Sequence, residues 1–155
     1  MKIYTAEIVY GEDSLWVKLG KNYVLQSDIL MRINTDRGTY KVRFKRNFKC
    51  DGLSVPKIFQ WFLPSWDKQN LLYNLAGAFH DWLYATGGNK GEFTREECDD
   101  CFRCLLRESG VTRFKAGAAD LAVGLFAGCK HHWRNDSNNI ADKLELKLYG
   151  PETED

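Results

Sequence analysis

Residues 30–49, LMRINTDRGTYKVRFKRNFK, decide how the first part of the chain folds. After the tetrapeptide Thr35-Asp36-Arg37-Gly38, apolar and cationic side chains alternate, which is typical of a strand with one buried face. The tetrapeptide separates two apolar runs and therefore predicts a β-hairpin turn. The alternating residues are Tyr40, Val42 and Phe44 on the apolar side and Lys41, Arg43 and Lys45 on the cationic side. We interpret the cationic side as a solvated strand surface, with a surface that faces an anion as the alternative.

The segments before this hairpin also predict strands. Residues 2–11, KIYTAEIVYG, and residues 14–20, SLWVKLG, are rich in β-branched and aromatic residues and end in glycines. After the hairpin, Asp51-Gly52 indicates a turn, and Pro56 and Pro64 bracket one expected helical turn. The first fifty residues therefore predict an antiparallel meander.

The second half predicts helices. Residues 69–85 place apolar side chains at helical spacing until Gly87-Gly88 ends the run. Thr94 and Glu97 form a capping box that begins a second helix, which continues to about Glu108. A third helix is expected after Thr112, within residues 113–133. The predicted fold class is α+β: an N-terminal antiparallel β meander or set of hairpins, followed by a three-helix C-terminal half.

Length and composition limit the possible classes of protein. With 155 residues, 44% of them hydrophobic, we expect a single domain over residues 1–150, β-rich at 1–50 and helical at 56–134, and a disordered acidic tail at 151–155. The net charge of +1 gives no strong nucleic-acid signal. No apolar run reaches the roughly 18 residues of a transmembrane segment. The N-terminus has no apolar signal-peptide core, so we expect synthesis into a cytoplasm.

Three of the five cysteines, Cys98, Cys101 and Cys104, lie on the predicted second helix. Neighbours on one helix do not easily form a disulfide, because the bond needs a specific Cα separation and opposed Cβ directions. Their C-x-x-C-x-x-C spacing resembles that of cluster ligands. Here it coincides with the apolar periodicity of a helix, where cysteine serves as a small hydrophobe. We therefore predict reduced thiols without bound metal.

A histidine and two aspartates flank the expected interface of the first two helices. In AGAFHDWLYATGG, residues 76–88, His80 lies half inside the apolar seam, Tyr84 shares its stripe and Asp81 points away from the seam. On the second helix, Asp99 lies beside the seam. The short connection favours antiparallel packing, which would let His80 meet Asp99. The carboxylate would then fix the tautomer of the imidazole.

The motif H-D-x-x-Y, from His80 to Tyr84, together with an aspartate on a partner helix, resembles secreted phospholipase A-two. This resemblance implies that His80 is a base that activates water, with Asp99 orienting it and Tyr84 supporting Asp99. It also implies calcium as cofactor, with Asp81 and Asp51 as metal ligands. The implied chemistry is metal-assisted ester hydrolysis by a general base.

A broader resemblance covers about residues 30–133. The runs FKCDGLSVPKIF (48–59), AGAFHDWLY (76–84) and REECDDCF (95–102) are similar, in the same order, to the motifs of domain-of-unknown-function family 1353. That family is phage-borne, so the resemblance implies a tailed-phage or prophage origin, and it implies no activity. It groups seven residues in one pattern: Asp51, Ser54, Pro56, His80, Asp81, Tyr84 and Asp99.

Three functional hypotheses remain open. The first is a small phospholipase-like hydrolase that acts on a lipid or ester, with His80, Tyr84 and Asp99 as its catalytic residues. The second is a non-enzymatic virion, tail or assembly component that contacts phage structural proteins, in which the same residues form a buried polar network. The third is a host-interaction or counter-defence protein that binds a host macromolecule. We expect the protein in the host cytoplasm, with incorporation into the virion as a further location.

Overall fold

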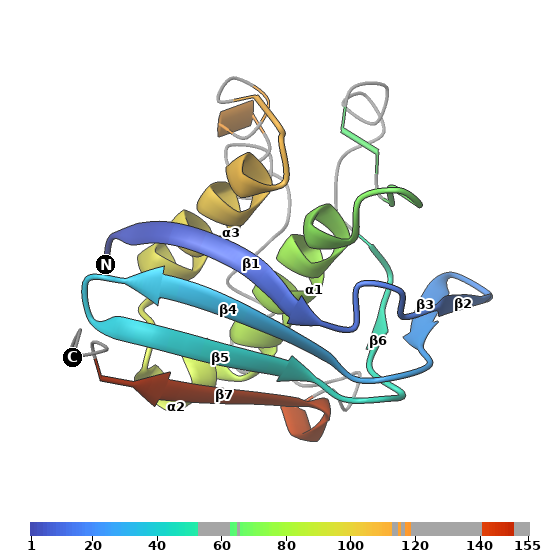
Figure 1. Cartoon of the computed structure of the whole chain (residues 1–155), viewed down its shortest axis with the longest axis horizontal. Coiled ribbons are helices and arrows are strands. Elements are labelled where there is room, and N and C mark those ends of the chain that lie inside the picture. The colour runs from blue at the N-terminus through green and yellow to red at the C-terminus, as the bar shows by residue number, and fades with distance from the viewer. Residues whose placement is uncertain (53–62, 65, 113–114, 116, 119–140, 151–155) are drawn as a thin grey trace.

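The structure, a computed structural model, describes residues 1–52, 63–64, 66–112, 115, 117–118 and 141–150. Within these residues, two antiparallel sheets and three helices form an α+β arrangement, as predicted (Figure 1). The larger sheet has the order β1-β4-β5-β7, with strands Ile3–Tyr10, Ile29–Thr35, Gly38–Phe44 and Leu144–Tyr149. The smaller sheet has the order β2-β3-β6, with strands Trp16–Leu19, Asn22–Leu25 and Lys49–Cys50. The helices are α1 (Leu71–Ala85), α2 (Gly87–Gly91) and α3 (Arg95–Glu108).

The predicted hairpin joins β4 to β5. Its register runs without a shift from the pair Thr35 and Gly38 to the pair Ile29 and Phe44. The apolar residues Tyr40, Val42 and Phe44 are buried, while Lys41 and Arg43 between them face outward. The alternation in the sequence therefore sets which side of the sheet faces the core.

The sequence analysis did not predict β7. This strand follows a 3-10 turn at Ala141–Lys143 and pairs antiparallel with β5. The pairing runs from Thr39 opposite Tyr149 to Phe44 opposite Leu144. The segment LELKLY does alternate apolar and polar residues, but six residues give a weak signal, and the pairing joins segments about a hundred residues apart in sequence. Gly38 allows the close approach of this strand, because a Cβ there would lie 2.2 Å from the Tyr149 carbonyl oxygen.

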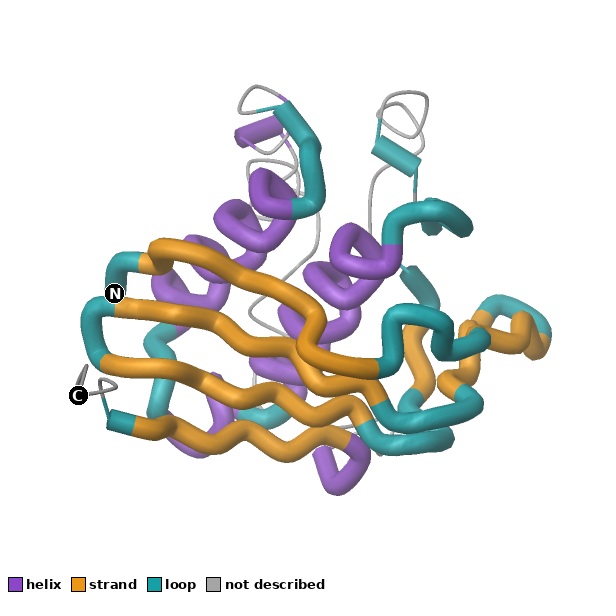
Figure 2. The backbone as a smooth tube through the Cα atoms, viewed as in Figure 1, coloured by secondary structure: helices purple, strands orange, loops and turns teal. Residues whose placement is uncertain are grey.

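Helices α1 and α3 cover one face of the larger sheet and run antiparallel (Figure 2). The start of α1 contacts the end of α3, where Asn70 Nδ2 donates to the Ser109 carbonyl oxygen at 2.8 Å. The buried faces of the two helices join the strand residues in one core. The antiparallel packing that the short connection predicted is therefore present, and it places the middle of α1 opposite the first half of α3.

The helix ends follow the sequence signals. The Asn70 side chain caps α1, and Thr94 with Glu97 forms the predicted capping box of α3. Between them, α2 is a left-handed turn, in which all five residues from Gly87 to Gly91 have positive φ. A Cβ on Gly88 would lie 2.0 Å from the Phe93 carbonyl oxygen. The glycines that end α1 in the sequence thus also make the tight reversal into α3.

The β4–β5 turn is tied to the start of α3. The Arg37 guanidinium forms an ion pair with the Glu97 carboxylate, and the Tyr40 hydroxyl donates to Glu92 Oε1 at 2.8 Å. Burial, followed by the neighbouring Glu92, raises the pKa of Tyr40 to about 12. These contacts hold α3 at a fixed position on the sheet.

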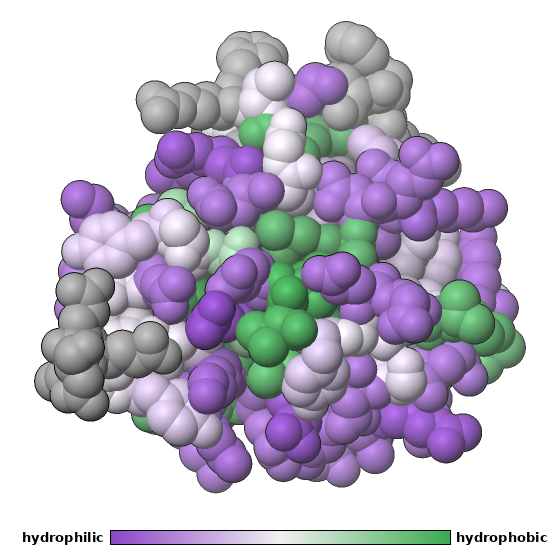
Figure 3. Space-filling model, in the orientation of Figure 1, coloured by the Kyte–Doolittle hydropathy of each residue, from purple (hydrophilic) through white to green (hydrophobic). Residues whose placement is uncertain are grey.

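Some predictions concern residues that lie outside the described ranges. They are the helical turn bracketed by Pro56 and Pro64, most of the third helix and the acidic tail at 151–155. The four described cysteines form no disulfide. In the described part of the chain, no helix combines the length and apolar character that crossing a membrane requires. Figure 3 shows apolar side chains at the β2–β3 hairpin, where Leu15 and Leu19 are exposed by 71% and 60%.

Candidate functional site

The antiparallel packing of α1 and α3 brings His80, Tyr84 and Asp99 together. His80 Nε2 lies 2.9 Å from Asp99 Oδ1, which is hydrogen-bond distance, so the two residues meet as the sequence predicted. The Tyr84 hydroxyl donates to the same Asp99 oxygen at 2.7 Å. Because His80 and Tyr84 are four residues apart on one helix, both reach one side chain of the partner helix.

The imidazole is held by aromatic rings. The centroid of the His80 ring lies 4.4 Å from that of Tyr84 and 4.8 Å from that of Phe102. The His80 side chain is 8% exposed, whereas the Asp99 side chain is 27% exposed. Solvent therefore reaches the pair mainly from the Asp99 side.

Asp99 is held as a carboxylate. Its partial burial acts to raise its pKa, but the hydrogen bonds from His80 and Tyr84 and the charge of Arg95 outweigh this effect, so the pKa of Asp99 lies below its ordinary value. A carboxylate only accepts hydrogen bonds, and Nε2 of a neutral His80 must therefore carry the proton. The lone pair is then on Nδ1, to which no described residue hydrogen-bonds.

Asp81 and Asp51 form a second group of the predicted site. Burial, followed by the negative charge of Asp51, raises the pKa of Asp81 to about 8. Burial also raises the pKa of Cys50, and the negative charges of Asp81 and Asp51 raise it further. Asp51, at the end of β6, therefore lies close to Asp81 on α1. Neither aspartate joins the hydrogen bonds of His80 and Asp99 among the described residues.

The two aspartates offer the type of ligand atom that calcium prefers, but too few of them to complete its coordination. Carboxylate oxygens are ligands that calcium prefers, and a cation would relieve the repulsion between the two charges. Calcium takes six to eight oxygens. Among the described residues, no group of three or more His, Cys, Asp or Glu side chains is placed to hold a metal ion. The described residues therefore supply part of a coordination shell.

Two residues of this site were not assigned to it from the sequence. Phe102 packs on the His80 ring, and the positive charge of Arg95 lowers the pKa of Asp99. Both lie one helical turn from Asp99, at i+3 and i−4, so helical spacing was the signal that could have found them. Cys50 was likewise assigned no role, although it lies next to the two aspartates.

Residues 25–123 match the profile of a family described as "Protein of unknown function (DUF1353)". The chain belongs to this family. The DUF1353 match runs from the end of β3 through α3, and it contains Asp51, His80, Asp81, Tyr84 and Asp99. No curated protein and no solved structure gave a significant match. Membership of DUF1353 fixes the ancestry of the site region, and the chemistry must be argued from the residues.

Proposed function

We propose that this DUF1353 protein is a small phospholipase-like hydrolase of lipid or ester substrates, with His80 as its general base. One observation carries the proposal: Asp99 Oδ1 accepts hydrogen bonds from both His80 and Tyr84, which fixes the imidazole with its Nδ1 lone pair free of described partners. A histidine oriented by a carboxylate is a recurrent arrangement for removing a proton from a nucleophile.

The proposed reaction needs one water molecule. Nδ1 of His80 takes a proton from this water, and the water oxygen attacks the carbonyl carbon of the ester. Asp99 stabilises the positive charge on the ring, and Tyr84 holds the carboxylate in position. The tetrahedral intermediate expels the alcohol, which receives the proton from His80. Calcium, when held by Asp81 and Asp51, would supply a Lewis acid for the carbonyl oxygen.

Turnover of phospholipid vesicles and of a simple chromogenic ester tests this proposal, in calcium and in chelator. We expect turnover by the wild type, and a loss of about 10²- to 10⁴-fold in kcat for Asp99→Asn, because the imidazole loses its orienting carboxylate. Tyr84→Phe should cause a smaller loss. Asp100→Asn is the matched control, because Asp100 is the next residue on α3 and its side chain pairs with Arg103 at the surface.

Two results would contradict the hydrolase proposal. One is the absence of turnover by folded wild type in calcium with either substrate. The other is an equal loss of turnover in Asp99→Asn and Asp100→Asn, which would separate the activity from the His80 network.

A specific observation favours a second candidate, a non-enzymatic phage virion, tail or assembly component or a host-interaction protein. The His80 side chain is only 8% exposed and lies against two aromatic rings, as in a structural polar network. In that case His80→Ala removes one of the two hydrogen bonds that Asp99 accepts and costs about 1–3 kcal/mol of stability. A chemical denaturation curve measures this cost. A destabilised variant of a protein without turnover supports the second candidate.

A further inference from the structure

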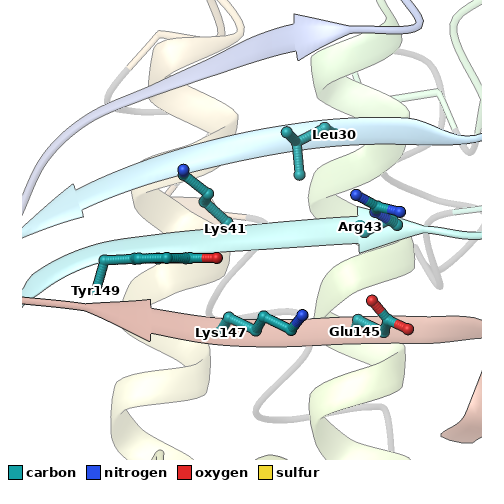
Figure 4. Close-up of a pocket in the computed structure, with 6 residues that line it drawn as sticks. All are labelled: Leu30, Lys41, Arg43, Glu145, Lys147 and Tyr149. Atoms are coloured by element: carbon teal, nitrogen blue, oxygen red, sulfur yellow. The ribbon is translucent and has the colours of Figure 1, made fainter.

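The outer face of the larger sheet carries a shallow pocket of about 180 Å³. It lies over β4, β5 and β7, on the side of the sheet opposite to α1 and α3 (Figure 4). Its walls are Leu30, Lys41, Arg43, Glu145, Lys147 and Tyr149. None of these residues belongs to the His80 site, so the pocket is a separate feature of the molecule.

The pocket holds more positive charge than its own acid neutralises. Lys41 of β5 and Lys147 of β7 are direct cross-strand neighbours, and so are Arg43 and Glu145. The Glu145 carboxylate is already engaged by Lys45 Nζ, 3.0 Å away at the rim. Lys41, Arg43 and Lys147 form no ion pair with any described residue. Three cations therefore line the pocket, and its single carboxylate, Glu145, is already paired with a fourth cation, Lys45.

A bound anion would relieve the repulsion within this cluster. Like charges directly opposite each other on one sheet face destabilise the pair of strands. The overall charge of +1 gives no sign of such a surface, because the cluster arises only when β7 pairs with β5. We therefore take up the second interpretation of the cationic strand face, a surface that faces an anion.

Tyr149 gives the pocket an aromatic wall. Lys41 Nζ lies 4.3 Å from the centre of its ring, and the residue remains 44% exposed. Figure 4 shows the ring edge-on, standing beside Lys41 and Lys147. An exposed ring beside several cations is the combination with which proteins bind single-stranded nucleic acid, since the cations meet phosphates and the ring stacks on a base.

We propose that this pocket binds a phosphate group of single-stranded nucleic acid through Lys41, Arg43 and Lys147, with a base stacked on Tyr149. Pockets that bind whole small molecules have volumes of about 300 Å³ or more. The volume of this pocket is smaller, and a single phosphate group suits it. A lipid surface fits less well, because the two most exposed of the large apolar side chains, Leu15 and Leu19, lie at the β2–β3 hairpin instead.

Fluorescence anisotropy of a labelled oligothymidine of about 12 nucleotides tests the proposal with the full chain. We expect binding that weakens as salt rises from about 50 to about 200 mM. Lys41→Gln and Lys147→Gln should each weaken binding about tenfold. Lys21→Gln is the matched control, because Lys21 is an exposed lysine in the β2–β3 turn.

The aromatic wall has its own pair of variants. Tyr149→Ala should weaken binding about tenfold, because a stacked base loses its platform, whereas Tyr149→Phe should bind like the wild type. Equal effects of these two variants would overturn the stacking. Thymidine monophosphate should displace the oligonucleotide better than inorganic phosphate does, and equal displacement would also overturn it.

Three further results would overturn the proposal as a whole. The first is the absence of oligonucleotide binding at low salt. The second is a loss of affinity in Lys21→Gln equal to that in Lys41→Gln and Lys147→Gln. The third is binding of anionic phosphatidylserine vesicles, instead of the oligonucleotide, with the same dependence on Lys41 and Lys147. Circular dichroism of each variant checks that these surface substitutions leave the fold intact.

Discussion

Asp81→Asn should remove a pH dependence from the stability of the metal-free protein. Burial and the charge of Asp51 raise the pKa of Asp81 to about 8 in the folded chain. In the unfolded chain an aspartate titrates near about 3.9. Between these two values the folded state binds more protons than the unfolded state, so the free energy of unfolding falls as pH rises. Asparagine does not ionise and contributes no such slope.

The size of the effect follows from the difference between the two pKa values. Well inside that range, one group contributes about 1.4 kcal/mol per pH unit. From about pH 5 to about pH 7, the wild type should therefore lose about 3 kcal/mol more stability than Asp81→Asn does. For a chain of this length, that difference corresponds to about 5–10 °C in melting temperature.

Urea denaturation of both proteins at several pH values, in chelator, measures the difference between their slopes. Titrating groups that do not interact with Asp81 are common to both proteins and cancel in the comparison. Millimolar calcium should flatten the wild-type slope if Asp81 and Asp51 hold the ion, because binding keeps the carboxylate ionised. Asp81→Asn should show no such response to calcium.

Parallel pH profiles for the two proteins would refute this reasoning. Asp81 is not completely enclosed, since part of the residue reaches the surface. Parallel profiles would show that water reaches the carboxylate and keeps its pKa near the ordinary value. The proximity of Asp51 would then have little consequence for stability.

Three further predictions concern the helices and the cysteines. Thr94→Ala should cost about 1 kcal/mol in a denaturation experiment because it removes the capping box of α3, and Thr94→Ser should retain most of that stability. Gly88→Ala should lower the free energy of unfolding by about 3 kcal/mol, since its Cβ would meet the Phe93 carbonyl. Gly91→Ala has open space around it and should cost only the strain of its positive φ. Equal losses of stability in the two variants would contradict the steric explanation. Thiol titration should find all five cysteines free after denaturation, and in the native protein the half-buried Cys104 should react before the fully buried Cys101, whose pKa burial raises further.

The sequence by itself determined the local elements of this fold. The alternation in β5, the turn at Thr35–Gly38 and the capping box at Thr94 each depend on residues close together in the chain, so short-range sterics and hydrogen bonding suffice to predict them. The same holds for the positions of His80 and Asp99 beside their apolar seams. Their contact at 2.9 Å could be predicted because a short connection leaves two amphipathic helices few ways to pack.

Tertiary structure decided everything that depends on distant segments meeting. The place of β7 beside β5 puts Lys147 next to Lys41, and the end of β6 brings Asp51 to Asp81. Strand pairing over about a hundred residues is chosen by which faces become buried in the complete core, and no local pattern contains that information. The His80 pair was therefore predictable from two helices, whereas the cationic pocket and the perturbed carboxylate exist only in the assembled fold.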